Sequence, residues 1–281
     1  MWIANGINDA NTAAWADSAW TSGPPWTSEI EKAGAFLESE PRGTVMYKQP
    51  KAIIFLGPPG SGKGTQAARL AAALDIPAIS TGDILRRECH ARTALGMKVE
   101  AVLQTGQLVS NTLMNQVVEN RLHRKDCRGG CILDGFPRTV EQARFLSELL
   151  RRLRAPEPLV FDFAVSAEDL IERLRRRRQC PTCGRIYSLR DGAVTQPTLC
   201  DNDRSLLMPR SDDQPEAIRE RLWSYEQNAA ELVRCYERGD YHRVAAARAP
   251  EQVTCQLLEV LGLGTMSPQV AAAGGYVLAS C

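Results

Sequence analysis

A glycine-rich segment at residues 57–65, Gly-Pro-Pro-Gly-Ser-Gly-Lys-Gly-Thr, has the composition of a loop that binds phosphate groups. Glycines let backbone N–H groups converge on phosphate oxygens, and Lys63 adds a positive charge that can reach the outer phosphates. An apolar run at 52–56 precedes the loop, and a helix-forming stretch at 65–74 would point the positive end of its dipole at the same oxygens. The general pattern has Ser or Thr directly after the lysine, whereas here Gly64 comes before Thr65. This arrangement predicts a nucleotide-binding site.

A second polar segment, Asp134-Gly-Phe-Pro-Arg138, follows the short apolar run 131–133. Ligands of open α/β sheets gather at the carboxyl ends of the strands. Asp134 is placed to organise Mg²⁺ beside a phosphate loop, and Arg138 to bind a phosphate. Asp134 taken alone could equally be a helix cap or a turn residue. The segment Ser80–Arg86, which also follows an apolar run, is by itself an ordinary strand-to-helix turn.

Two short groups of potential metal ligands occur in Cys180-Pro-Thr-Cys183 and Cys200-Asp-Asn-Asp203, separated by residues 184–199. Two such pairs are typical of a tetrahedral zinc site held by two turns, and a carboxylate can serve as a ligand beside thiolates. Four protein ligands would leave no open coordination position, so we expect a structural metal. The sequence does not distinguish zinc from iron.

The elements that would position these residues alternate between strand and helix. Apolar runs predict buried strands at 52–56, 76–80, 131–133, 159–165 and 241–245. Helices are expected at 65–74, 83–90, 112–124, 139–153, 167–178, 214–237 and 250–261. Alternating βα units predict an α/β fold of three layers, with a central parallel sheet covered by helices on both faces.

Composition limits the function further. The 281 residues carry a formal net charge of +1, which gives no global reason to expect a nucleic-acid or membrane partner. No apolar run reaches the roughly 18 residues that would cross a bilayer. Nine cysteines in an enzyme-like sequence favour a reducing compartment, and we expect a cytoplasmic protein. The cysteines outside the two metal-ligand groups are expected to be small, buried or half-buried fillers with free thiols; they are Cys89, Cys127, Cys131, Cys235 and Cys255.

From about Lys51 to Gly264 the chain resembles the nucleoside monophosphate kinases, and most closely the long, lid-bearing adenylate kinases. The motifs that carry the resemblance are the 57–65 loop, Ser80–Arg86, Gly106-Gln-Leu-Val109, Asp134–Arg138 with Gln142, and Arg210-Ser-Asp-Asp213. It implies a P-loop domain at 48–264, with a nucleoside monophosphate-binding segment at 80–109 and a zinc-bearing lid at 176–213. Residues 1–47 are expected to be a disordered extension, or to lie upstream of a true start at Met46, and residues 265–281 to be a tail.

The resemblance also implies roles for individual residues. Those expected to act in phosphoryl transfer are Lys63, Asp134, Arg138, Arg173, Arg177, Arg210 and Arg221. Those expected to bind ATP are Gly57, Gly60, Ser61, Gly62, Lys63, Gly64, Thr65, Arg177, Ile186 and Tyr187, with Mg²⁺ between Thr65 and Asp134. Those expected to bind AMP are Thr81, Arg86, Gln107, Leu108, Val109, Gly135, Phe136, Pro137, Arg138, Gln142, Arg210 and Arg221. The expected Zn²⁺ ligands are Cys180, Cys183, Cys200 and Asp203.

The implied reaction moves a phosphoryl group from Mg-ATP to AMP and gives two ADP. No protein base is needed, because a phosphate oxygen of AMP attacks directly, so the arginines supply charge stabilisation and positioning. Arg175 and Arg176, in the run 175–178, could be a solvated helix face or a nucleic-acid patch; we expect the solvated face.

Two alternatives stay open at this point. One keeps the reaction but takes UMP, CMP or GMP as acceptor; Thr81, Gln142 and the long lid favour AMP. The other is a nucleotide-responsive binding protein that engages nucleic acid. The complete set of charged groups disfavours it, because a protein that only binds could lose them. We expect a monomer without nucleic-acid or membrane partners. The replacement of the family's Asp-Gly by Ala245-Ala246 puts local adenine contacts in doubt.

Overall fold

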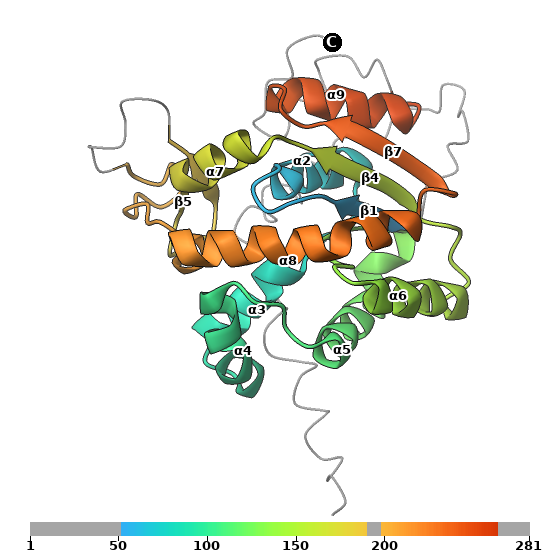
Figure 1. The fold of residues 1–281 in the computed structure, drawn as a ribbon, viewed down its shortest axis with the longest axis horizontal. Coiled ribbons are helices and arrows are strands. Elements are labelled where there is room, and N and C mark those ends of the chain that lie inside the picture. Colours follow the sequence, from blue (N-terminus) through green and yellow to red (C-terminus); the bar gives the residue numbers. More distant parts are fainter. Residues whose placement is uncertain (1–51, 190–197, 264–281) are drawn as a thin grey trace, which may run out of the picture. The chain divides into compact units, whose positions relative to one another are not determined.

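The central element of the molecule is a parallel five-stranded sheet, seen in a computed structural model that describes residues 52–189 and 198–263 (Figure 1). The strand order is β2-β3-β1-β4-β7. The strands are β1 Ala52–Leu56, β2 Ala78–Ser80, β3 Cys131–Asp134, β4 Leu159–Ala164 and β7 Asp240–Ala245. In this register Phe55 lies opposite both Asp134 and Phe161, so the loop after β1 emerges beside the end of β3.

Helices connect the strands, as a parallel sheet requires. They are α2 Lys63–Leu74, α3 Thr81–His90, α4 Ala94–Thr105, α5 Asn111–Leu122, α6 Val140–Arg152, α7 Ala167–Arg176, α8 Pro215–Arg234 and α9 Pro250–Val260, with 3₁₀ turns η4 Lys125–Gly129 and η6 Ser211–Asp213. Several begin at a hydroxyl side chain that accepts a hydrogen bond from the backbone N–H three residues later. These caps are Ser80, Thr93, Thr139 and Ser166.

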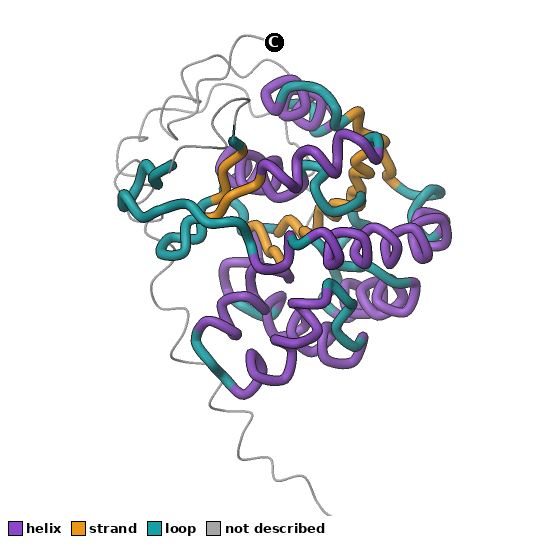
Figure 2. The backbone as a smooth tube through the Cα atoms, turned by 60° about the vertical axis from the view of Figure 1, so that its left-hand side comes forward, coloured by secondary structure: helices purple, strands orange, loops and turns teal. Residues whose placement is uncertain are grey.

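Two apolar cores lie on opposite faces of the sheet, because successive strand side chains point to opposite sides. Ile54, Leu133 and Val160 pack with α5, α6 and α8 on one face. Phe55 and Phe161 pack with α2 and α9 on the other. Figure 2 shows helices on both sides of the strands. The predicted three-layer α/β fold with a central parallel sheet is therefore confirmed.

The sequence prediction differs from the structure at four of these elements. Of the run 76–80, only the residues of β2, Ala78–Ser80, form a strand. The helix expected to begin at residue 83 begins at Thr81. The helix expected at 167–178 ends at Arg176, because Arg177 starts the two-stranded antiparallel sheet of β5 Arg177–Gln179 and β6 Ile186–Ser188. Helix α4 was not predicted. Its interior Gly96 lowers helix propensity.

The remaining expectations meet the structure only in part. Residues 1–47 and 265–281, and residues 190–197 of the predicted lid, lie outside the described residues. Cys131 is buried as expected, whereas Cys235 is exposed and Cys255 is disulfide-bonded. The prediction of a buried or half-buried free thiol was thus wrong at these last two positions. Among the described residues no helix has the length and apolarity to cross a membrane.

Gly96 allows α4 to approach the end of α3, and we expect Gly96→Ala to destabilise the protein. A Cβ atom at this position would lie 2.0 Å from the backbone oxygen of Glu88, a contact that forces the helices apart. Overpacking of this kind lowers the free energy of unfolding by about 1–3 kcal/mol. Chemical denaturation measures the change. Gly129→Ala is the matched control, because an added Cβ there meets no atom within 4 Å, and equal stability of the two variants would contradict the prediction.

Candidate active site

The glycine-rich loop joins β1 to α2 and adopts backbone conformations that favour glycine. Gly57, Gly60 and Gly62 have φ angles of 135°, 86° and 95°. A side chain would also collide with neighbours, because a Cβ at Gly57 would lie 2.9 Å from the Phe163 carbonyl oxygen. The loop ends where α2 begins at Lys63, so its N–H groups lie at the positive end of the helix dipole. The local geometry is that of an anion-binding loop.

Lys63 folds back onto this loop. Its Nζ donates hydrogen bonds to the carbonyl oxygens of Gly57 (2.8 Å) and Pro58 (2.7 Å) and to Oγ of Ser61 (3.1 Å). Burial lowers the pKa of Lys63 to about 8, opposed by Asp134 and reinforced by three nearby arginines, Arg138, Arg221 and Arg177. A negatively charged ligand on the loop would stabilise the protonated form of Lys63 and raise its pKa.

Asp134 lies at the carboxyl end of β3 and faces the start of α2. A Cβ at Gly64 would be only 3.3 Å from Oδ2 of Asp134, so the carboxylate reaches the loop. Burial raises the pKa of Asp134, although Lys63 opposes the shift. Thr65, in the first turn of α2, is exposed on the same helix end. A hydroxyl and a carboxylate beside a phosphate loop are the oxygen donors that suit Mg²⁺.

A pocket opens beside the loop, between α3, the end of α4, the β3–α6 connection and α8. It is lined by Thr81, Gly82, Leu85, Arg86, Leu103, Gly106, Gln107, Leu108, Val109, Met114, Gly135, Arg138, Gln142, Asp212 and Arg221. Most residues that the resemblance assigned to AMP are in this lining. The exceptions are Phe136, whose side chain is fully buried in the core, Pro137 and Arg210.

The pocket wall holds polar groups in defined positions. Thr81 donates a hydrogen bond to the carbonyl oxygen of Gly135 at 2.9 Å. Nε of Arg138 donates to the same oxygen at 2.8 Å. The backbone N–H of Arg138 donates to Oε1 of Gln142, also at 2.8 Å. The β3–α6 connection therefore orients both an arginine and an amide toward the pocket.

Two carboxylates on η6 hold the arginines together. Asp212 accepts from Arg86 (3.3 Å), from Arg210 (3.1 Å) and from Arg221 (3.3 Å). Burial raises the pKa of Asp212, but Arg210, Arg221 and Arg86 outweigh it and hold this pKa at about 2. The carboxylate thus stays charged and keeps three guanidinium groups at one edge of the pocket.

Asp213 extends the same cluster toward the lid. It pairs with Arg177, whose Nε donates at 2.6 Å, and with Arg221 at 3.1 Å. We assigned no role to Asp212 or Asp213 from the sequence. A signal was present, because several arginines gathered in a partly buried site need counter-charges, and Arg210-Ser-Asp-Asp213 carries two next to one of those arginines.

Arg173 is predicted to act in phosphoryl transfer, but no partner fixes its side chain in the described part of the chain. It is half-buried on α7 and, within the described residues, makes no hydrogen bond or ion pair. Helix α7 packs against the phosphate loop, since a Cβ at Gly60 would lie 2.9 Å from the Leu174 side chain. Arg173 is one residue from this contact.

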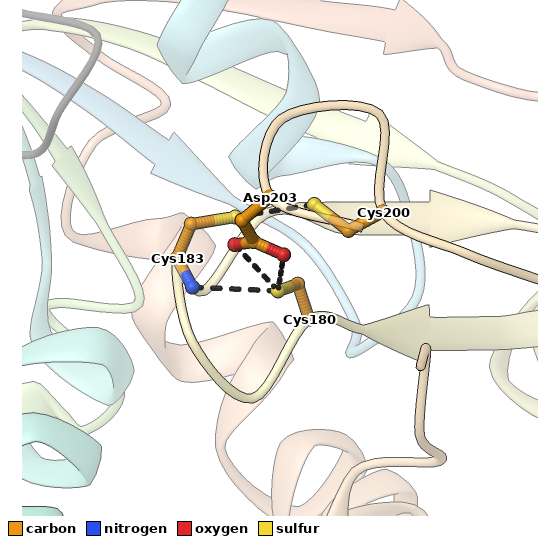
Figure 3. Close-up of side chains that lie close together, drawn as sticks. All are labelled: Cys180, Cys183, Cys200 and Asp203. Atoms are coloured by element: carbon orange, nitrogen blue, oxygen red, sulfur yellow. Dashed lines mark hydrogen bonds between the residues drawn. The ribbon is translucent and has the colours of Figure 1, made fainter. Parts of the chain in front are cut away.

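The four predicted metal ligands come together in the segment predicted to be a lid, as Figure 3 shows. Their donor atoms, three Sγ and one carboxylate oxygen, lie within 4.8 Å of one another. Sγ of Cys180 is 3.2 Å from Oδ2 of Asp203, and Sγ of Cys183 is 3.5 Å from Sγ of Cys200. Three sulfurs and an oxygen at this spacing fit a tetrahedral zinc ion.

The lid residues assigned to ATP have different surroundings. Ile186 is exposed on β6. The hydroxyl of Tyr187 lies 3.3 Å from Sγ of Cys200 and accepts a hydrogen bond from the backbone N–H of Asp201 at 3.1 Å. The polar end of Tyr187 therefore supports the turn that carries a metal ligand, and only its ring remains for other contacts.

Comparison with known proteins points to one family. The sequence model of adenylate kinase matches residues 55–241. The adenylate kinase of Anaeromyxobacter dehalogenans strain 2CP-1 is 40% identical over 75% of this chain and 99% of its own length. That of Thermosipho africanus is 42% identical over 67% of this chain and 88% of its own length. That of Thermotoga maritima is 40% identical over 75% of this chain and 96% of its own length.

The lowered pKa of Lys63 predicts that binding of a nucleoside triphosphate to the loop takes up a proton in mildly alkaline solution. A lysine with a pKa of about 8 is charged below that pH and increasingly neutral above it. Phosphates favour the charged form, so binding raises the pKa and affinity falls as the pH rises through about 8. Calorimetric titration at about pH 8.5, in buffers of different ionisation enthalpy, measures the uptake.

Lys63→Arg is the control for this linkage, because a guanidinium keeps its proton at that pH. The variant should bind without the Lys63-dependent uptake. Identical proton uptake by the variant and the original protein would contradict the assignment of the titrating group.

Proposed function

The chain belongs to the adenylate kinase family, and we propose that it catalyses the reversible transfer of a phosphoryl group from Mg-ATP to AMP, giving two ADP. Members of this family transfer phosphoryl groups between nucleotides. The observation that carries the choice of substrates is the pocket beside the loop, which combines three arginines with apolar walls. Donor phosphates on the loop and an acceptor phosphate in this pocket would meet beside Lys63.

The donor side would be organised by the loop and by Asp134. Backbone N–H groups of the loop and the start of α2 hold the β- and γ-phosphates, and Lys63 exchanges its loop carbonyls for phosphate oxygens. Thr65 and Asp134 would hold Mg²⁺. The ion would neutralise charge on the transferring group.

The acceptor phosphate would be held by arginines from the pocket wall. Arg86, Arg138 and Arg221 line this space, while Arg177 and Arg210 join the same cluster through Asp213 and Asp212. An oxygen of the acceptor phosphate is itself the nucleophile, so no side chain needs to remove a proton. Positioned arginines contribute about 10³- to 10⁵-fold to rates in related phosphoryl transfers.

The acceptor base would lie against the apolar part of the pocket. Leu85, Leu103 and Met114 supply a surface suited to a flat ring, and the Gln142 amide supplies hydrogen bonds at its edge. These features favour AMP over pyrimidine acceptors, because a buried amide discriminates between bases by the groups it leaves unpaired. The cytoplasmic location and the monomeric state expected from the sequence remain predictions.

Mixing the protein with Mg-ATP and, separately, AMP, UMP, CMP or GMP tests the proposal. We expect ADP formation with a strong preference for AMP, and formation of ATP and AMP from ADP alone. Lys63→Met should lose nearly all turnover while it keeps its fold, because only the phosphate-directed charge is removed. Turnover with another acceptor would move the substrate within the same reaction. No turnover with any acceptor would favour a nucleotide-binding role.

We further propose a structural zinc ion in the lid, bound by Cys180, Cys183, Cys200 and Asp203. The apolar core of this segment is small and consists of two of the ligands with Leu207. Four protein ligands leave no position for a reacting molecule, so the ion would stabilise and not catalyse.

Cys183→Ser should lower both the zinc content and the melting temperature and leave appreciable activity at low temperature. Zinc-driven folding of small domains is worth roughly 10–16 kcal/mol, so the lid should be the first part to unfold. Metal analysis and thermal denaturation measure the two effects. Cys235→Ser, an exposed thiol outside the lid, is the matched control. Purified protein without stoichiometric zinc, whose melting is indifferent to a chelator, would refute the site.

A further inference from the structure

A chain of side-chain amides leads from the pocket to the protein surface. Gln142 is buried, with 2% of its surface exposed, and lines the pocket. Its Nε2 donates to Oδ1 of Asn111 at 2.9 Å. Nδ2 of Asn111 in turn donates to Oε2 of Glu141 at 2.7 Å, at an exposed position. The first residue of α5 is thus connected to both the pocket amide and a surface carboxylate.

The two ends of this chain have unambiguous chemistry. The Glu141 carboxylate only accepts hydrogen bonds, so Asn111 must turn its NH₂ group toward it and its oxygen toward Gln142. At the other end, the backbone N–H of Arg138 only donates, so it requires the oxygen of Gln142. Both constraints give the Gln142 amide the same orientation, although an amide could otherwise be turned by 180°.

The hydroxyl of Thr139 fixes the middle of the chain. It accepts a hydrogen bond from the backbone N–H of Gln142 at 3.2 Å, so its own proton points elsewhere. That proton goes to Oδ1 of Asn111 at 3.1 Å. Asn111 therefore has an independent reason to present its oxygen to Gln142.

We propose that Asn111, oriented by Glu141 and Thr139, is a positioning residue that fixes the polarity of Gln142 toward the acceptor base and so selects adenine. This inference rests on the proposed use of AMP. In its fixed orientation Gln142 retains one N–H and one oxygen lone pair for a ligand, in a set order. Adenine carries an acceptor at N1 beside a donor at its 6-amino group.

Hypoxanthine, the base of IMP, has nearly the same shape but the reverse order, with a donor at N1 and an acceptor at O6. A free amide could rotate and satisfy either base. A fixed amide would face hypoxanthine with donor against donor and acceptor against acceptor, and unpaired polar groups of this kind give strong discrimination. A comparison of AMP with IMP therefore tests the orientation of the Gln142 amide, because the two bases differ in hydrogen-bonding order and hardly in shape.

The experiment compares kcat/KM for AMP and IMP in the full-length protein and in four variants. Asn111→Leu removes the acceptor for Gln142, and we expect the AMP/IMP ratio to fall about tenfold, the effect of one lost buried hydrogen bond. Glu141→Leu, at an exposed position, should lower the ratio less but in the same direction. The KM for ATP should not change in either, because the donor site is not touched.

Two further variants serve as controls. Asn111→Asp combined with Glu141→Gln keeps an oxygen acceptor facing Gln142 and Thr139 and puts an amide donor beside the new carboxylate, so the ratio should be retained. Thr112→Leu, one residue further on the exposed side of α5, adds the same side chain without touching the amide chain and should leave the ratio unchanged.

A merely structural role for Asn111 predicts another pattern. Asn111→Leu would then lower kcat/KM for AMP and IMP equally and leave their ratio unchanged, which would overturn the inference. If this variant does not fold, Asn111→Ala removes the same acceptor with a smaller side chain, and an unchanged ratio there has the same meaning. Failure of the proposed function is recognised before any variant is made, because the original protein would then not turn over AMP, or would not prefer it to IMP.

Discussion

Repulsion between like charges is the constraint on which this site depends. Lys63, Arg138, Arg177 and Arg221 lie close enough to influence one another, and the pKa of Lys63 falls to about 8 partly for that reason. Such a group of cations would spread apart if it had no counter-charges. Asp212 and Asp213, adjacent on η6, pair with four arginines between them and keep them at the pocket edge before any substrate arrives. Preorganisation of this kind is what electrostatic catalysis requires, since the charges need not move during the reaction.

The fold places the members of this cluster by backbone geometry. The parallel register of β1 and β3 brings the phosphate loop beside Asp134. Close contacts then fix the other walls: a Cβ at Gly106 would lie 2.6 Å from the Ala217 carbonyl oxygen, so the end of α4 meets α8 where Arg221 begins to reach the pocket. Glycine at this point lets the end of α4 approach the helix that supplies Arg221. Gly106 itself lines the pocket, so this close approach fixes the position of one of its walls.

The predicted lid, residues 176–213, has a different source of stability from the central sheet. It has few apolar residues to bury, and several of its larger ones, including Ile186, Leu206 and Met208, are exposed. Hydrophobic burial alone is a weak stabilising term for a segment of this size. Four side chains from two turns, with the Tyr187 hydroxyl beside one of them, would provide an alternative source of stability in the proposed metal site. This division leaves Arg177, at the first residue of β5, at the junction between the lid and the arginine cluster.

The sequence by itself determined the βα alternation and the phosphate loop, because each is encoded by local spacing: apolar runs of strand length and glycines before a helix. Cysteines in pairs likewise predicted the candidate metal ligands, and the resemblance to the adenylate kinases predicted most of the pocket lining. Only the tertiary structure decided the rest. Helix α4 depends on packing against α3 that overrides its interior glycine. The counter-charge role of Asp212 and Asp213 involves arginines as far apart in the chain as Arg86 and Arg221. The orientation of Gln142 depends on Asn111, on another helix. These features are long-range hydrogen bonds and contacts, and no local pattern of residue types specifies which distant groups will meet.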